Sequence, residues 1–515
     1  MTKNILLLND YVDEVFLSRT LGPYKVASAL RNNGYKVQVI DFLHTFSYEE
    51  IKKALTYFIN DNTLFVGFNT FFYKDISKQS IINSSNQWEN GGLAFGEKTI
   101  GALLPHGIEF NDDIINLIKT INKNCKIVLG GPDAQVLPHI KYFDYTILGY
   151  ADDSIVNLAN HLAKNEPLKN SRKSIYKSIV IDDAKAEKYN FTETPMLFHK
   201  NDLILNNESL MIEISRGCIF NCAFCSYPLN GKKKNDFIKL KNVLIEEFIY
   251  HYENFGVTRY MFSDDTFNDS PEKIELMYQI SKELPFKLEY WAYIRLDLLT
   301  AHKEYINKLF DSGLRACHFG IETLNKKTAS LIGKGGDKNK MFETVKYIKN
   351  KYGDTVSLYG SFIFGLPEES VESMKKTGEL LKNGESGLDS WNINPLMIGS
   401  QQQKFLSKIE LNHEKYGYTL LDWDSNLKRY NWKNEYTCLT ECENLAEYYI
   451  NEGAKTSEKK INSLSSFYSC ASGVDLEYSL NKKIRTFDWS SLEKRKKIMS
   501  NEYRKRLFKI AREEY

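Results

Sequence analysis

RGCIFNCAFC occupies residues 216–225 and directly follows Met211–Ile214, a short apolar run that predicts a buried strand. The motif places three thiols, Cys218, Cys222 and Cys225, within eight residues. Thiolates at this spacing can hold one metal centre, and soft thiolate ligands select zinc or iron–sulfur clusters. A structural zinc site requires four ligands, and no fourth Cys or His lies nearby. The motif therefore favours an iron–sulfur cluster with one open iron, and a zinc site completed from a distance is the alternative.

The residues around this motif alternate strands with helices. Strands are predicted at 211–214, 259–262, 287–293, 316–320, 356–364 and 390–396, with helices at 241–254, 271–283, 302–312, 338–350 and 369–383. Six strand–helix units in about 190 residues predict a partial (β/α)6 barrel over residues 209–400. Its site is expected at the carboxyl ends of the strands, where the cysteine motif lies.

A first alternating series precedes the barrel. Its predicted strands are 4–8, 36–40, 64–68, 126–129 and 145–148, and its predicted helices are 24–32, 48–59, 112–121 and 153–163. This rhythm predicts a doubly wound parallel sheet, and hence an α/β domain, over residues 1–165. The remaining segments are a loop or lid at 72–110, a polar linker at 166–208 and a helical C-terminal region at 401–515.

Composition limits the class of protein. The chain has 515 residues, 42% hydrophobic and 26% charged, with a net charge of +2, which is typical of a globular protein and does not indicate a polyanion binder. No apolar run is long enough to span a membrane, and the first residues do not resemble a signal peptide. We therefore expect a cytoplasmic protein without a membrane partner, in which eight cysteines indicate metal or redox chemistry.

The spacing Cys-x3-Cys-x-aromatic-Cys after the first strand of a six-unit barrel resembles the radical S-adenosylmethionine (SAM) superfamily. The resemblance implies a 4Fe-4S cluster on Cys218, Cys222 and Cys225, with Phe224 near the adenine of SAM. It also implies an enzyme whose open iron chelates SAM, which one electron then cleaves to methionine and a 5′-deoxyadenosyl radical. An electron donor such as flavodoxin or ferredoxin and a small-molecule substrate are the expected partners.

Two further strand ends resemble the same superfamily. Asp264 and Asp265 end the second strand, where the family places acceptors for the SAM ammonium, often as Gly-Gly-Glu. Which Asp accepts is open, and an acidic surface turn is the alternative. Residues 361–368 (SFIFGLPE) resemble Gly-x-Ile-x-Gly-x-x-Glu, with a Ser in place of the first Gly. The resemblance places Ile363 and Gly365 against the adenine.

Arg295 and Glu322 end the third and fourth strands. The resemblance implies that Glu322 binds the ribose or the methionine region of SAM and that Arg295 pairs with the SAM carboxylate. A structural ion pair in the rim of the barrel is the alternative for both residues.

The N-terminal sheet resembles the cobalamin-binding subgroup of the superfamily. The supporting residues are Leu21–Tyr24 (LGPY), residues 130–132 (GGP) and Gly149. The Asp-x-His-x-x-Gly signature, whose His ligates cobalt, is absent: His44 has the wrong spacing and His139 lies beyond a strand end. We expect cobalamin to bind at the carboxyl ends of the strands without a histidine ligand. A domain that has lost this ligand is the alternative.

If cobalamin binds, the resemblance implies methylation of an unactivated carbon or phosphorus. The alternative is a cobalamin-independent radical rearrangement, oxidation or cyclisation. A rival from another class is a non-catalytic zinc-binding or nucleic-acid-binding protein. Its contact surface would be residues 493–515, where nine Lys and Arg accompany four Glu. A solvated helix face is the commoner meaning of such a segment.

The remaining cysteines are expected to be structural. Cys438 and Cys442 share one face of a predicted helix, and Cys470 could complete a second cluster with them. Cys125 and Cys317 fall in predicted strands and are expected in the core. His318, beside Cys317, is expected to line the barrel.

Overall fold

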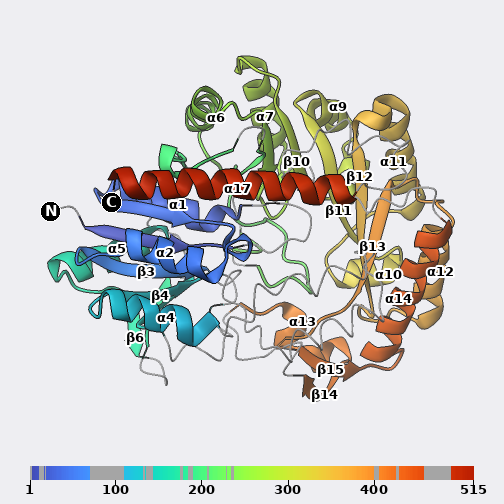
Figure 1. Cartoon of the computed structure of the whole chain (residues 1–515). Coiled ribbons are helices and arrows are strands. Elements are labelled where there is room, and N and C mark those ends of the chain that lie inside the picture. The colour runs from blue at the N-terminus through green and yellow to red at the C-terminus, as the bar shows by residue number, and fades with distance from the viewer. Residues whose placement is uncertain are drawn as a thin grey trace.

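The computed structural model describes residues 3–10, 17, 19–69, 110–131, 134, 143–173, 178–183, 190–205, 208–227, 229–232, 237–399, 405–424, 429–456 and 489–514. Two sheets of largely parallel strands lie next to each other, each with helices packed on it (Figure 1). The short 3-10 helices are η1 (Leu43–Thr45), η4 (Lys200–Asp202), η5 (Phe267–Asp269), η6 (Gly353–Thr355) and η7 (His413–Tyr416). Among the described residues, no helix is both long enough and apolar enough to cross a membrane.

The N-terminal sheet has the strand order β2-β1-β3-β4-β5-β7-β6. Its first five strands are parallel: β1 (Asn4–Leu8), β2 (Lys36–Ile40), β3 (Thr63–Asn69), β4 (Lys126–Gly130) and β5 (Tyr145–Gly149). Helices α1 (Leu21–Asn32) and α5 (Asp152–Lys164) pack into one core, and α2 (Tyr48–Phe58) and α4 (Phe110–Ile121) pack into another. The predicted doubly wound sheet is confirmed. The strand order reverses between β1 and β3, which is where such sheets bind ligands.

Part of the predicted linker belongs to this sheet. Strand β7 (Ile179–Asp183) pairs parallel with β5, and β6 (Ser171–Lys173) pairs antiparallel with β7. The sequence of β6 is entirely polar, so it carried no apolar pattern by which the strand could be predicted.

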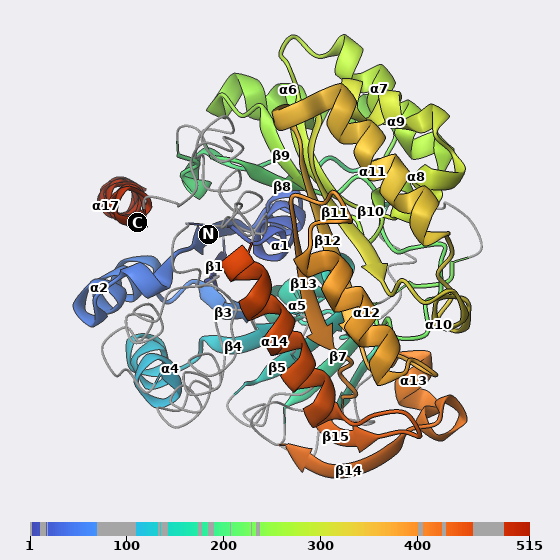
Figure 2. The same cartoon turned by 90° about the vertical axis from the view of Figure 1, so that its right-hand side faces the viewer.

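The second sheet holds six parallel strands in sequence order, from β8 to β13. They are β8 (Leu210–Ile212), β9 (Arg259–Phe262), β10 (Glu289–Ile294), β11 (Leu314–Glu322), β12 (Ser357–Phe364) and β13 (Ser390–Pro395). The helices between them are α6 (Lys241–Phe255), α7 (Pro271–Glu283), α8 (Leu296–Ala301), α9 (Glu304–Asp311), α10 (Lys326–Leu331), α11 (Lys338–Tyr352) and α12 (Val371–Lys382). The partial barrel predicted from the sequence is confirmed, and Figure 2 shows its helices outside the strands.

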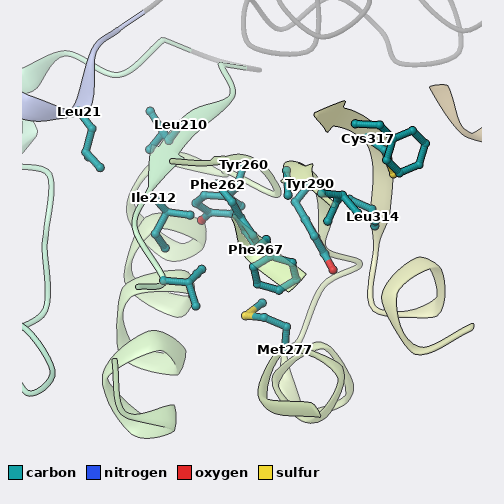
Figure 3. Packing of buried hydrophobic residues seen from close by; sticks show 14 of the residues in the cluster. Leu21, Leu210, Ile212, Tyr260, Phe262, Phe267, Met277, Tyr290, Leu314 and Cys317 are labelled. Carbon is teal, nitrogen blue, oxygen red and sulfur yellow. The ribbon is translucent and has the colours of Figure 1, made fainter. Parts of the chain in front are cut away.

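Alternate residues of these strands pack against the outer helices and form the larger core (Figure 3). The rings of Phe262 on β9 and Tyr290 on β10 stack with centroids 4.1 Å apart, and Phe267 meets both rings edge-on. Met277 of α7 is fully buried in the same core. Each such side chain contributes about 1.5–3 kcal/mol by burial. Cys317 is buried here and Cys125 in the N-terminal domain, so both are core residues as predicted.

The C-terminal region is helical but also contains a hairpin that the sequence did not predict. Strands β14 (Thr419–Asp424) and β15 (Arg429–Lys433) pair antiparallel. The helices are α13 (Lys408–Leu411), α14 (Leu439–Thr456) and α17 (Trp489–Glu514). Helix α14 packs on α12 and β13 of the barrel, whereas α17 crosses the N-terminal domain beside α2 (Figure 1).

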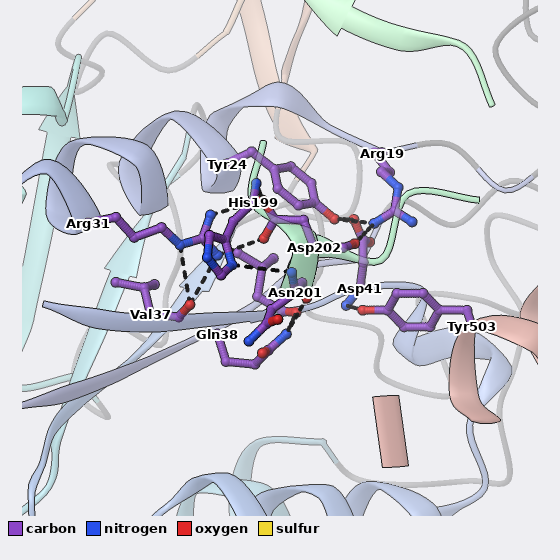
Figure 4. Close-up of polar contacts among 11 residues, drawn as sticks. Arg19, Tyr24, Arg31, Val37, Gln38, Asp41, His199, Asn201, Asp202 and Tyr503 are labelled. Carbon is purple, nitrogen blue, oxygen red and sulfur yellow. Dashed lines mark hydrogen bonds and ion pairs between the residues drawn. The ribbon is translucent and has the colours of Figure 1, made fainter. Parts of the chain in front are cut away.

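A buried polar network fastens α17 to the start of the chain (Figure 4). The Tyr503 hydroxyl accepts a hydrogen bond from the Asp41 backbone N–H at 2.9 Å, and the Tyr24 hydroxyl donates to the Asp41 carboxylate at 2.7 Å. Arg19 donates to Tyr24 and pairs with Glu208 at 2.6 Å. One face of α17 is therefore buried in the N-terminal core, so this helix is not exposed to solvent on all sides.

Candidate active site at the strand ends of the second sheet

The loop after β8 folds back on itself around the three cysteines. Gly217 has a φ of +71°, and a Cβ there would lie 2.7 Å from the carbonyl oxygen of Leu229, so only glycine fits without distortion. The backbone N–H of Gly231 donates to the carbonyls of Cys218 and Phe220, both at 2.9 Å. These contacts fix the loop and leave Cys218 and Cys222 buried and Cys225 half-buried.

Each thiol has a different neighbour. Cys218 Sγ lies 3.5 Å from the Thr266 hydroxyl, and Cys225 Sγ accepts from the Asn230 side-chain amide at 2.9 Å. Burial raises the pKa of the Cys218 and Cys225 thiols, so a bound cation is needed to hold them as thiolates at neutral pH.

The arrangement of the thiols bears on what they can bind. Among the described residues, no three His, Cys, Asp or Glu side chains are placed to hold one metal ion. Zinc would need all its sulfur ligands about 2.3 Å from a single point. In a 4Fe-4S cluster each cysteine binds a different iron, and all-sulfur ligation is the rule. Three cysteines on one fixed loop, with no fourth metal ligand beside them in the described part of the chain, fit a cluster with one open iron better than a zinc ion.

The two aspartates that end β9 have different surroundings. Asp264 is buried and accepts from the Ile214 backbone N–H at 3.0 Å and from the Ser215 hydroxyl at 2.5 Å. It therefore anchors the start of the cysteine loop. Asp265 is half-buried beside that loop, and burial, with the nearby charges of Asp264 and Glu213, raises its pKa to about 7. The raised pKa means that the charged form of Asp265 is destabilised, and a ligand that is cationic or donates hydrogen bonds would stabilise that form.

Arg295 and Glu322 are both in ion pairs, but not with each other. Arg295 pairs with Asp297 at 2.5 Å, its guanidinium carbon lies 3.9 Å from the centre of the Phe220 ring, and its Nη1 lies 3.9 Å from Cys222 Sγ. It thus holds the cysteine loop from the third strand end. Glu322 is buried at a φ of +68°.

Lys334 is a site residue that the sequence reasoning missed. It lies in the glycine-rich loop after α10, and its ammonium donates to the Gly320 carbonyl at 2.9 Å and lies 3.5 Å from Glu322 Oε1. The loop carbonyl of Gly333 accepts from Arg295 at 3.4 Å. The only available signal was the sequence GKGG at 333–336, which follows no strand and had no pattern of its own.

The three residues predicted to lie near adenine are placed as follows. Phe224 is half-buried against the larger core. Ile363 is half-buried on the same face of β12 as Tyr359 and pairs with Asn394 of β13. Gly365 has a φ of +84°, and a Cβ there would lie 2.4 Å from the Trp432 ring and 2.8 Å from Cys442 Sγ. Gly365 is thus required by the packing of the C-terminal region, whatever it contacts in a ligand.

A buried group of four charges joins the cysteine loop to the N-terminal domain. Arg216 makes two hydrogen bonds with Asp152, at 2.8 and 3.1 Å, and two with Glu213, at 3.1 and 3.2 Å. Lys25 of α1 pairs with Glu213 at 2.6 Å. The charges balance in number, which is what burial of ions requires. The Tyr150 ring lies 4.7 Å from the Arg216 guanidinium carbon.

The same residues Lys25, Tyr150 and Asp152 line a cavity at the carboxyl ends of β1, β3, β4 and β5. It encloses about 880 Å³ of space, including part that is open to solvent. Much of its wall is backbone: a Cβ at Gly22 or at Gly130 would meet no atom within 4 Å, so both glycines border open space. Apolar side chains such as Val128 and Ile155 complete the lining. A backbone-walled, largely apolar cavity at the switch point fits a large flat ligand.

Neither histidine considered as a cobalt ligand is among the described residues that line this cavity. His139 lies outside the described residues. His44 Nδ1 lies 2.6 Å from Asp10 Oδ1, with which it shares a hydrogen bond. His44 is not among the described residues that line the cavity.

Cys442 is fully buried, with its Sγ 3.7 Å from the Thr437 hydroxyl, and burial raises its pKa to about 12. Cys442 therefore behaves as the core residue that we expected. Cys438 is half-buried and Cys470 lies outside the described residues.

Comparison with known sequences agrees with this geometry. Residues 212–381 match the sequence profile of the Radical SAM superfamily. An uncharacterized methyltransferase of Pyrococcus horikoshii is 26% identical over 289 residues, which cover 52% of this chain and 60% of the relative. Bacteriochlorophyllide d C-12(1)-methyltransferase of Chlorobaculum tepidum is 26% identical over 179 residues, covering 34% of this chain and 38% of the relative. The chain thus spans less than two thirds of either relative.

Solved structures share the fold over nearly the whole chain. The radical S-adenosylmethionine methyltransferase TsrM from Kitasatospora setae, with cobalamin and a 4Fe-4S cluster bound, has a TM-score of 0.62 at 12% identity and covers 98% of this chain and 99% of its own. The cobalamin-dependent S-adenosylmethionine radical enzyme OxsB, with aqua-cobalamin and S-adenosylmethionine bound, has a TM-score of 0.57 at 15% identity and covers 99% and 84%. The three chains therefore share one fold over the aligned lengths.

Proposed function

Residues 212–381 form a radical SAM domain within the fold of the cobalamin-dependent members, and from this premise we propose that the chain is an enzyme that cleaves SAM reductively and methylates a small molecule. The observation that carries the proposal is the loop after β8. It presents three buried or half-buried thiols beside a half-buried carboxyl group, and it is tied by Arg216 to a cavity in the neighbouring domain.

Cys218, Cys222 and Cys225 would hold the cluster, which would supply an open iron for SAM, and the fixed backbone of their loop would keep the three thiols beside the strand ends. Asp265 would accept hydrogen bonds from the SAM amino group, since Asp264 is already occupied as a loop anchor. Arg295 would keep Phe220 and Cys222 in place from the third strand end. Lys334 and Glu322 would meet the polar parts of SAM at the fourth.

The cavity of the N-terminal domain would hold cobalamin, with Gly22 and Gly130 letting the backbone approach the ring. When bound, the cluster supplies the electron that cleaves SAM, and cobalamin supplies the methyl group. The ion pair of Arg216 with Asp152 would hold the cysteine loop against the domain that contains the cobalamin cavity. A donor such as flavodoxin or ferredoxin would deliver the electron. Methyl transfer is in keeping with the names of the relatives, which are called methyltransferases. An unactivated carbon or phosphorus is the proposed acceptor.

Anaerobic reconstitution with iron and sulfide tests the first half of the proposal. The wild-type chain should acquire the absorbance of a 4Fe-4S cluster and release 5′-deoxyadenosine from SAM in the presence of a reductant. The variant with Cys218, Cys222 and Cys225 replaced by Ala should do neither. The variant with Cys438 replaced by Ala is the matched control and should do both. Stoichiometric zinc in place of iron, or SAM cleavage by the triple variant, would refute the proposal.

Cobalamin binding tests the second half. Wild-type protein should retain cobalamin through gel filtration, and Gly130→Leu should not, because its side chain would occupy the open space of the cavity. Lys375→Leu is a control, since it adds a leucine side chain at an exposed position of α12, outside this cavity. Wild-type protein that cleaves SAM without binding cobalamin would instead support a radical rearrangement, oxidation or cyclisation.

A further inference from the structure

The inner face of the barrel carries a layer of rings at the level below the SAM-binding strand ends. Tyr293 of β10, His318 of β11 and Tyr359 of β12 stand opposite one another in the strand register. The centres of the Tyr293 and His318 rings are 4.8 Å apart, and those of His318 and Tyr359 are 4.6 Å apart. We call these three residues the aromatic layer.

The layer faces the inside of the barrel rather than its helices. The neighbouring residues of β10, Tyr290, Ala292 and Ile294, belong to the core that packs against the helices. Trp291 lies on the other face and forms a separate buried cluster with Ala316 and Met261. This cluster lies one layer further toward the amino ends of the strands. Tyr293, two residues beyond Trp291, is nevertheless 37% exposed although β10 is an interior strand of the sheet. The edge of the aromatic layer is therefore accessible from solvent.

The charges at this level indicate what the ligand is. Burial, together with the ammonium of Lys334, lowers the pKa of His318 to about 4, so the imidazole is neutral at physiological pH. The Lys334 ammonium would also repel a cation that approached the rings. An anion gains little from Lys334, because the ammonium is already bonded to the Gly320 carbonyl and lies beside Glu322. The layer is thus suited to an uncharged group.

Three adjacent aromatic rings bind a planar aromatic ring more tightly than they bind a saturated ring. Offset or edge-on contacts between aromatic rings add to the energy of apolar burial, and a saturated ring makes only the burial term. We propose that the aromatic layer binds an uncharged, planar, conjugated ring of the substrate. This inference rests on the proposed function, of which it names the substrate class.

The probes are 2-naphthol, which is planar and uncharged at pH 7, and decahydro-2-naphthol, its saturated counterpart. Binding to the reconstituted full chain is measured by equilibrium dialysis and by the NMR signal of the His318 ring, assigned with His318→Gln. We expect 2-naphthol to shift that signal and to bind at least about threefold more tightly than the saturated compound. Tyr293→Leu should weaken 2-naphthol binding about three- to tenfold. Tyr347→Leu, on the outer surface of α11, is the matched control and should leave it unchanged.

The inference would be overturned if the two probes bound with equal affinity or if 2-naphthol did not bind. It would also be overturned if Tyr293→Leu and Tyr347→Leu changed 2-naphthol binding equally. SAM cleavage is measured on the same preparations of the wild-type chain and of both variants. A chain that binds 2-naphthol as expected but cannot cleave SAM would refute the proposed function and leave the ring site standing. A chain that cleaves SAM but does not discriminate between the probes would refute the ring site alone.

Discussion

Replacing Asp152 with Asn should destabilise the protein strongly, because it leaves the Arg216 guanidinium buried with one carboxylate instead of two. The side chains of Arg216 and Asp152 are 0% and 4% exposed. Removing one partner of such a pair typically costs about 3–5 kcal/mol, since the remaining charge has lost its compensation. Glu213 still pairs with Arg216, so we expect a loss near the lower limit, about 3 kcal/mol.

A surface ion pair of similar length provides the comparison. Lys241 and Glu283 are 2.5 Å apart, against 2.8 Å for Arg216 and Asp152, but their side chains are 37% and 50% exposed. Glu283→Gln should therefore cost less than about 1 kcal/mol. Urea unfolding of the full chain, followed by circular dichroism, measures both variants. If Asp152→Asn costs no more than Glu283→Gln, burial of the charges does not stabilise the contact between the domains in the way that we argue.

The same network predicts sensitivity to acid. Burial alone would raise the pKa of Asp152 and of Glu213, but the charges of Lys25 and Arg216 outweigh it and hold both values below the usual range. Groups with a lowered folded-state pKa stabilise the protein above their unfolded pKa, about 4, and that contribution is lost as the pH falls through the folded value. Wild-type stability should thus fall below about pH 4, and Asp152→Asn should show a smaller fall.

Two further predictions concern the cofactors. Asp265→Asn should weaken SAM binding about tenfold by removing the acceptor of a charge-assisted hydrogen bond, whereas Asp264→Asn should mainly lower the unfolding temperature. Equilibrium dialysis with SAM and thermal unfolding measure the two effects, and equal SAM affinities of the two variants would contradict the assignment. Cob(II)alamin bound to the chain should show no nitrogen splitting from an axial histidine in its paramagnetic-resonance spectrum, because no histidine is among the described residues that line the cavity; such splitting would show that a histidine reaches the cobalt.

The sequence was most informative where a regular element ends in chemically distinctive residues. The strand–helix alternation and the cysteine spacing predicted both sheets and the loop that carries Cys218, Cys222 and Cys225. Strand β14 was missed because most of its residues are exposed, so no alternation of apolar and polar residues marks it. Lys334 was missed because its position depends on a loop that folds over the barrel.

The roles of individual residues were harder to predict than their neighbourhood. Asp264 and Asp265 are adjacent in sequence and chemically identical, and only the structure shows that the first is hydrogen-bonded to the loop, while burial and nearby charges raise the pKa of the second, our proposed SAM acceptor, to about 7. Arg295 likewise pairs with Asp297, two residues along the chain, rather than across the rim with Glu322. Such differences depend on the direction of a side chain, which a one-dimensional pattern does not contain.

The bond between Tyr503 and the backbone of Asp41 has a consequence for how the protein is made. The two residues are 462 positions apart, so a ribosome completes the whole barrel between synthesising one and the other. Until α17 emerges, the apolar surface of the N-terminal domain that Tyr503, Leu507 and Ala511 later cover, beside α2 and Phe42, is exposed to solvent. The nascent domain therefore has a period in which it can aggregate or bind a chaperone. Expression tags and truncations at the C-terminus should affect the solubility of the first domain synthesised more than that of the last.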